Sequence, residues 1–294
     1  MILNRCRDRN LFRLILDVLS EDGLMDFIEK LEAISRKQNS LVCVGLDIDK
    51  EMMPKFLFKT KRNPFLDFTK ALIDETNDIV CAYKLNMAFY EVLGEQGWHV
   101  LQETMNYIPK DVIVILDGKR NDIGNTAQKY AQTLFEGLHA DAVTVNPYMG
   151  FDSIKPFLGY ENTCSFILCR TSNPSARDFQ DLIVEGKPLY IHVAEKVKKW
   201  QTEGTCGVVV GATYPDELKE IRKLLGEHVP FLIPGIGKQG GDIKTTVEYG
   251  TNSDKQLAII NSSRGIIYAG AETDFAKKAR EATIELNESI NRYR

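Results

Sequence analysis

Residues 111–138 read DVIVILDGKRNDIGNTAQKYAQTLFEGL, and this stretch contains the unit from which the fold is inferred. An apolar, β-branched run ends at Asp117, a polar loop follows, and apolar residues then recur at helical spacing from Ala127 to Leu138. The run is continuously apolar, as expected of a parallel strand that is buried on both faces. The stretch therefore predicts one strand–loop–helix unit of an α/β protein.

The same unit recurs along the chain on both sides of this stretch. The candidate strands are Leu41–Asp47, Ile79–Leu85, Asp111–Asp117, Ala142–Asn146, Cys164–Cys169, Gly207–Gly211, Pro230–Pro234 and Leu257–Ser262. Helical patterns separate them. One starts at Asn63-Pro64, an N-cap followed by a first helical residue, and another runs from Pro215 to a C-terminal Gly226. Eight such units without a linker-like break predict a single-domain (β/α)8 TIM barrel.

Composition restricts the function classes. With 44% hydrophobic and 27% charged residues, the 294-residue chain has the balance of a soluble globular protein, and no apolar run approaches the roughly 18 residues of a membrane span. The net charge of −4 provides no basic excess for nucleic-acid binding. The six cysteines include no CxxC pair and are interpreted as buried thiols, which places the protein in a reducing compartment, the cytoplasm.

The first 24 residues differ from the rest. They carry Arg5, Arg7, Arg9 and Arg13 ahead of an apolar stretch, without the features of a secretory signal. Acidic residues in the same segment weaken the alternative of a transit peptide. We expect residues 1–24 to be an extension of uncertain role, with Met25 as a second possible start and residues 25–294 as the barrel domain.

Chemistry in such barrels sits at the C-terminal ends of the strands. Asp47, Lys84 and Asp117 are at or near the ends of the first three predicted strands, and Lys119 and Asp122 follow closely. Because Asp117 and Lys119 are two residues apart, their side chains are expected to leave the same side of the pleat. The alternative to a catalytic cluster is a surface salt-bridge cluster that takes part in no reaction.

A glycine-rich segment, PGIGKQGG at 234–241, follows the seventh strand. Its backbone N–H groups can approach an anion closely, and Gln239 and Arg264 can reach the anion's oxygens. Loops after strands seven and eight commonly bind phosphate in this fold. The segment has neither the G-x-G-x-x-G dinucleotide pattern nor a GK[ST] P-loop, so we expect a phosphate site of another kind.

Three motifs together resemble one family. The chain reads VILDGKRNDIGNTA at 114–127, NPYMG at 146–150 and TSNP at 171–174, and from about Met25 to Gly270 it resembles orotidine 5′-phosphate decarboxylase, longer bacterial-type branch. The resemblance implies a carboxy-lyase that converts orotidine 5′-monophosphate (OMP) to UMP and CO2, the last step of de novo UMP biosynthesis. It implies no metal and no organic cofactor.

The resemblance also implies roles for individual residues of this chain. Lys119 would protonate C6 of the pyrimidine, Asp117 would destabilise the substrate carboxylate, and Lys84 would orient Asp117. Asp122 and Thr126 would reach the neighbouring subunit's site, which makes the active unit a homodimer. The expected catalytic residues are thus Lys119, Asp117, Lys84 and Asp122, and the expected substrate-binding residues are Asp47 and Thr126 at the ribose, Ser172 at the pyrimidine, and Pro234, Gln239 and Arg264.

Two alternatives remain open at this point. A similar barrel group, the hexulose-phosphate synthases and gulonate-phosphate decarboxylases, uses D-x-K-x-x-D with Mg²⁺ to stabilise an enediolate. That group has a carboxylate where this chain has Lys84, and a cation there repels Mg²⁺. The other alternative is a non-catalytic sugar-phosphate sensor, which would not need the repulsive Asp117. The four histidines form no spaced cluster, and we expect none of them to be catalytic.

Overall fold

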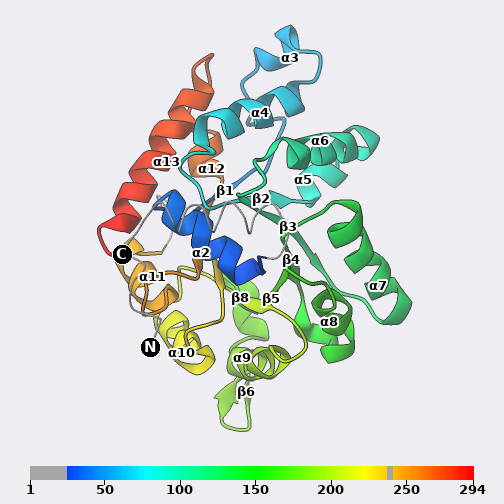
Figure 1. Ribbon diagram of the computed structural model, residues 1–294, viewed down its shortest axis with the longest axis vertical. Coiled ribbons are helices and arrows are strands. Elements are labelled where there is room, and N and C mark those ends of the chain that lie inside the picture. Colours follow the sequence, from blue (N-terminus) through cyan, green and yellow to red (C-terminus); the bar gives the residue numbers. More distant parts are fainter. Residues whose placement is uncertain (1–24, 237–240) are drawn as a thin grey trace, which may run out of the picture.

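A closed barrel of parallel strands forms the centre of the protein. The computed structural model describes residues 25–236 and 241–294. Within these ranges each barrel strand pairs with the next along the chain, and the last closes on the first (Figure 1). The barrel strands are β1 (Val42–Gly45), β2 (Ala82–Asn86), β3 (Ile113–Arg120), β4 (Ala142–Val145), β5 (Cys164–Arg170), β8 (Cys206–Val210), β9 (Phe231–Pro234) and β10 (Ala258–Ser262). The predicted (β/α)8 barrel is confirmed.

Helices surround the barrel and follow its strands (Figure 1). The α-helices are α2 (Phe27–Lys37), α3 (Leu57–Thr60), α4 (Pro64–Thr76), α5 (Ala88–Glu91), α6 (Gly94–Tyr107), α7 (Gly124–Gln132), α8 (Phe151–Leu158), α9 (Leu189–Trp200), α10 (Pro215–Leu225), α11 (Ile243–Gly250), α12 (Arg264–Ile267) and α13 (Phe275–Asn291). Short 3-10 helices are η2 (Pro147–Met149) and η3 (Pro174–Asp178). After η3, β6 (Ile183–Val184) and β7 (Lys187–Pro188) form a small antiparallel hairpin that projects from the barrel.

Local sequence signals explain several helix ends. The Asn63 side chain accepts a hydrogen bond from the Leu66 N–H at the start of α4, as its N-cap position predicts. Gly226 follows α10 with φ of +80°, a conformation that suits glycine. The helix predicted through Leu138 differs, because α7 ends at Gln132 and continues as a π-helical turn over Thr133–Gly137.

The N-terminal end of the barrel is covered by α2. Phe27 packs edge-on against Phe166 of β5. Lys30 pairs with Asp141, directly before β4, and Lys37 pairs with Asp111, two residues before β3. Because α2 covers this end, the C-terminal end of the barrel is left for a site.

Strand β3 departs from its predicted bounds. The predicted strand ended at Asp117, whereas β3 continues to Arg120 through a bulge. Leu116 is in register with Val143 but Arg120 with Val145, so β3 has two residues more than β4 over this interval. Lys119 takes a left-handed backbone conformation, with φ of +45°, inside the bulge. The motif is therefore presented by a distorted strand and not by the regular strand end that we predicted.

Three further expectations concern the cysteines, membrane-spanning helices and the N-terminal extension. The five cysteines in the described part of the chain are free and buried, as predicted. No helix among the described residues is long and apolar enough to span a membrane. The predicted extension over residues 1–24 lies outside the described residues.

Candidate active site

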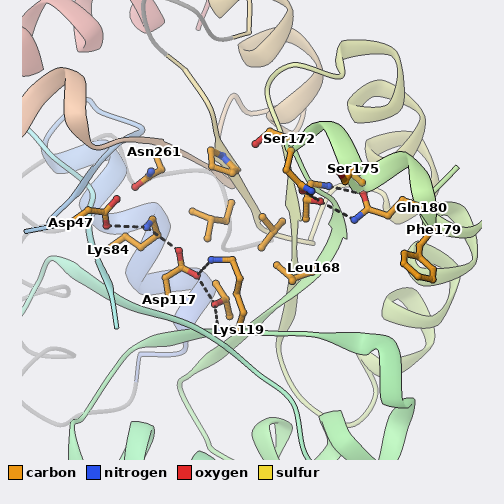
Figure 2. Close-up of a pocket in the computed structure, with 17 residues that line it drawn as sticks. Asp47, Lys84, Asp117, Lys119, Leu168, Ser172, Ser175, Phe179, Gln180 and Asn261 are labelled. Carbon is orange, nitrogen blue, oxygen red and sulfur yellow. Dashed lines mark hydrogen bonds and ion pairs between the residues drawn. The ribbon is translucent and has the colours of Figure 1, made fainter. Parts of the chain in front are cut away.

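A cavity of about 550 Å³ opens at the C-terminal ends of the barrel strands. Its lining combines strand residues with residues of the loop after β5 (Figure 2). The lining residues are Asp47, Lys84, Asp117, Lys119, Thr144, Leu168, Thr171, Ser172, Asn173, Ser175, Ala176, Phe179, Gln180, Val209, Leu232, Pro234 and Asn261. Six of the residues predicted from the sequence thus meet in one cavity: Asp47, Lys84, Asp117, Lys119, Ser172 and Pro234.

Four charged groups alternate along one side of this cavity. Lys84 Nζ lies 3.7 Å from Asp47 Oδ1 and 3.0 Å from Asp117 Oδ2. Lys119 Nζ lies 2.7 Å from the other oxygen of Asp117, Oδ1. Lys84 and Asp117 are only 4% and 8% exposed, so this is not a surface salt-bridge cluster. The side chain of Lys119 is 47% exposed and is the cation of the array that incoming substrate can reach.

The array fixes the charge state of its buried members. Burial disfavours the ionised form of Asp117, but the ammonium groups of Lys84 and Lys119 outweigh burial and hold the pKa of Asp117 well below its usual range. Burial likewise opposes the charge on Lys84, yet Asp117 and Asp47 raise the pKa of Lys84 above its ordinary value. At neutral pH both groups are therefore ionised in the folded protein.

Thr144 of β4 completes the array, and the sequence analysis missed it. Its hydroxyl donates to Asp117 Oδ1 over 2.8 Å and accepts from the Lys119 backbone N–H over 2.9 Å. It therefore holds both the carboxylate and the bulged backbone that carries Lys119. The available signal was a single polar residue inside the apolar strand 142–145, AVTV. Asn261 of β10 also lines the cavity and was not predicted either. Like Thr144, it is a polar residue within a strand that is otherwise mostly apolar.

Asp47 is positioned by a tyrosine from a distant segment. The Tyr268 hydroxyl donates to the Asp47 carbonyl oxygen over 2.8 Å and accepts from the Asp49 N–H over 2.6 Å. Tyr268 directly follows α12, which begins at Arg264. The turn after β1 is thus tied to the segment that carries the predicted phosphate ligand.

The opposite side of the cavity is built by the loop after β5. Ser172, Ser175, Phe179 and Gln180 lie together there, across Leu168 from the charged array (Figure 2). Ser172 sits directly against the end of β8, because a Cβ atom at Gly211 would come within 2.8 Å of the Ser172 Cβ. Glycine at position 211 is what permits this close approach.

The remaining predicted site residues are placed differently. Asp122 is half-buried and Thr126 is exposed, and neither belongs to the described lining of this cavity. Arg264 is exposed at the first residue of α12 and is likewise absent from that lining. Gln239 lies outside the described residues. Their proposed contacts with substrate remain predictions.

The arrangement supports proton transfer beside a negatively charged group. Lys119 presents its amino group to the cavity, and the adjacent Asp117 keeps a fixed negative charge next to it. Among the described residues no group of three or more His, Cys, Asp or Glu is placed to hold a metal ion. The space between the Asp47 and Asp117 carboxylates is occupied by the Lys84 ammonium.

Known proteins match this chain over most of its length. The family model described as "Orotidine 5'-phosphate decarboxylase / HUMPS family" matches residues 40–279. Orotidine 5′-phosphate decarboxylases of Dehalococcoides mccartyi and a Janthinobacterium species are 47% and 48% identical, each over 92% of this chain and 99% of its own length. These bacterial relatives confirm the predicted resemblance to the bacterial-type branch.

A solved structure agrees with the sequence matches. The structure of Leishmania donovani OMP decarboxylase superimposes with a TM-score of 0.79 at 37% identity. The match covers 92% of this chain and 98% of that one, so it extends over most of both chains.

Proposed function

This chain belongs to the orotidine 5′-phosphate decarboxylase / HUMPS family, and on that premise we propose that it converts OMP to UMP and CO2. The observation that carries the proposal is the alternating array of Asp47, Lys84, Asp117 and Lys119 at the cavity, in which Lys84 and Asp117 are buried. The reaction is a step of UMP biosynthesis. The buried free thiols support a cytoplasmic location for it.

The chemistry follows from the charges of the array. The bond between C6 and the carboxylate breaks, CO2 leaves, and the electron pair stays on C6. Lys119 Nζ then gives a proton to C6, forming UMP, and regains a proton from water. Asp117 places a negative charge beside the substrate carboxylate, which raises the energy of the bound substrate relative to the transition state, where that charge disperses.

Substrate binding uses the rest of the cavity. We assign the ribose to Asp47, the pyrimidine to Ser172, and the phosphate to Arg264 and Gln239, with Pro234 at the cavity wall. Phosphate binding far from C6 supplies energy that favours the ordered, water-excluding complex in which the array acts most strongly.

The position of Lys84 favours this function over metal-assisted enediolate chemistry. A divalent cation between two carboxylates would have to take the place that Lys84 Nζ holds, 3.0 Å from Asp117 and 3.7 Å from Asp47. Like-charge repulsion from a buried ammonium disfavours such binding. We therefore propose that the reaction needs neither a metal nor an organic cofactor.

We further propose that the active unit is a homodimer. Asp122 directly precedes Ile123, which is one of four exposed apolar side chains that we call the mouth patch: Val92, Ile123, Tyr148 and Met149. Contacts connect its parts, because Arg120 pairs with Glu91, next to Val92, and Asn121 donates to the Asn146 carbonyl, next to η2. A second copy of the chain on this patch would bury it and bring Asp122 and Thr126 to the partner's ribose site.

A spectrophotometric assay tests the reaction. Purified wild-type protein is mixed with OMP, and loss of OMP absorbance and release of CO2 are followed with and without excess EDTA. We expect turnover that EDTA leaves unchanged. Absence of turnover would refute the decarboxylase function, and loss of activity that Mg²⁺ restores would favour the metal-dependent alternative.

Mixing two variants tests the shared site. Lys119→Ala and Asp122→Ala homodimers should each be nearly inactive. A hybrid dimer would contain one site with both wild-type residues, so subunit exchange of an equal mixture should restore about a quarter of wild-type activity. If no activity returns although exchange is demonstrated, Asp122 does not act across the interface.

A further inference from the structure

We propose that Arg170 and Gln180 form a clasp that positions Ser172, and that both are therefore positioning residues for substrate binding. The proposal rests on the proposed function, in which Ser172 binds the pyrimidine. It concerns a buried arginine and a glutamine to which the motifs gave no role. The clasp joins the end of β5 to the loop that forms one side of the cavity.

Arg170 is a charged residue that the fold has buried at the end of β5. It is only 1% exposed, and its guanidinium lies 3.9 Å from the centre of the Tyr214 ring. Arg170 Nη2 pairs with Asp181 over 3.0 Å and with Glu217 of α10 over 3.9 Å. A buried cation is costly unless it is paired, so these partners are held close to the barrel. Asp181 is thereby fixed, and it is the residue next to Gln180.

Gln180 uses its side-chain amide to hold the start of the same loop. Its Oε1 accepts from the Thr171 N–H over 2.9 Å and from Arg170 Nη1 over 3.3 Å. Its Nε2 donates to Thr171 Oγ1 over 2.8 Å. Both polar atoms of the amide are engaged within the protein, as the dashed lines beside Ser172 indicate (Figure 2). Gln180 therefore lines the cavity as a support for its wall.

The consequence falls on Ser172, the residue after Thr171. The clasp holds Thr171 from the side of the loop. On the side of β8, the close approach of Gly211 limits the space in which Ser172 can move. The Gly211 N–H also donates to the Arg170 carbonyl over 2.8 Å, so β5 and β8 hold this corner together. Ser172 itself is exposed to the cavity. Without the clasp an exposed loop residue would sample many positions, and a displaced Ser172 hydroxyl would lose part of its contact with the pyrimidine, which raises KM.

A double-mutant cycle on kcat/KM for OMP tests the clasp. Gln180→Leu should lower kcat/KM up to about tenfold, mainly through KM, because displacing Ser172 costs no more than removing its hydroxyl. In a Ser172→Ala background the same change should cost less than about threefold, because the group that the clasp positions is already gone. Gln180→Glu keeps the acceptor for Thr171 and Arg170 and should recover most of the activity.

Matched controls separate positioning from general stability. Gln201 Nε2 donates to the Cys206 carbonyl over 2.6 Å, away from the cavity, so Gln201→Leu should lower the free energy of unfolding and leave kcat/KM within about twofold. Asp178, which is exposed on the same loop and does not line the cavity, should tolerate alanine with unchanged kinetics. Amide hydrogen exchange should show faster exchange in residues 171–182 of Gln180→Leu and unchanged protection in the barrel strands.

The outcomes distinguish the two proposals. Wild-type turnover of OMP with additive effects of Gln180→Leu and Ser172→Ala would overturn the clasp and leave the decarboxylase standing. Absence of wild-type turnover would refute the decarboxylase, and hydrogen exchange would then decide the clasp. Unchanged exchange in residues 171–182 of Gln180→Leu would overturn the clasp in either case.

Discussion

The two sides of the cavity are built in different ways. The charged side comes from residues at the ends of β1 to β4, where neighbouring strands fix Lys84, Asp117 and Thr144, and Tyr268 holds the turn that carries Asp47. The other side comes from the loop after β5, which side-chain hydrogen bonds hold in place. Charged groups that must keep a fixed geometry are carried by strands, and groups that contact the substrate's pyrimidine are carried by a loop. We therefore expect changes on the charged side to affect kcat and changes on the loop side to affect KM.

The largest effect should follow from removing the central carboxylate. Asp117→Ala should lower kcat about 10³-fold, because the charge that disfavours the substrate carboxylate and holds Lys119 in place is lost. Thr144→Val, which removes one hydrogen bond to Asp117 but keeps the charge, should cost only about tenfold. Steady-state kinetics with OMP measure both. Equal losses in the two variants would contradict the assigned importance of the Asp117 charge.

A smaller effect is expected on the loop side. Ser172→Ala should raise KM about tenfold and change kcat only a few-fold, because a hydrogen bond to the pyrimidine stabilises the bound substrate and the transition state alike. The same kinetic assay separates the two parameters. A fall in kcat at constant KM would place Ser172 in the chemical step and remove the contrast between the two sides.

The low pKa of Asp117 makes stability depend on pH. A carboxyl whose folded pKa is depressed contributes stability in full above its unfolded pKa of about 3.9, and this contribution is lost as pH falls toward the folded pKa. Below about pH 5 the free energy of unfolding should therefore fall more steeply in wild type than in Asp117→Asn, by up to about 1.4 kcal/mol per pH unit. Urea unfolding from pH 3 to 6 measures this. Parallel slopes would show that Asp117 has an ordinary pKa.

The smallest effect concerns the bulge in β3. Lys119 has φ of +45°, a conformation that costs a residue with a Cβ atom about 1 kcal/mol more than glycine. Lys119→Gly should therefore be more stable than Lys119→Ala by about 1 kcal/mol, since both lack the amine and differ only at the backbone. Thermal unfolding of the two variants makes the comparison. Equal stability would show that the bulge relaxes in the variants.

Much of this site could be predicted from the sequence. Strand periodicity and the barrel rule together led to Asp47, Lys84, Asp117 and Lys119, because parallel strands bring their C-terminal ends to one place. The bulge that presents Lys119 was not predictable, since it depends on register with β4 and on the Thr144 hydroxyl.

The other omissions have physical reasons of their own. Thr144 looks like an ordinary strand residue until its neighbours are known. Gln180 acts through partners nine and ten residues away, in a loop without periodicity. Asp122 and Thr126 lie outside the described lining of their own chain's cavity, and the role proposed for them needs a second copy that a single sequence does not place.

The central claim is that the charged side performs the chemistry, and Lys119→Ala tests it most directly when kcat for OMP and the affinity for UMP are measured on the same preparation. The account predicts that kcat falls at least about 10²-fold, as for loss of a general acid, while the dissociation constant of UMP changes only a few-fold. Near-normal turnover by Lys119→Ala, or a loss of UMP affinity as large as the loss of kcat, would contradict it.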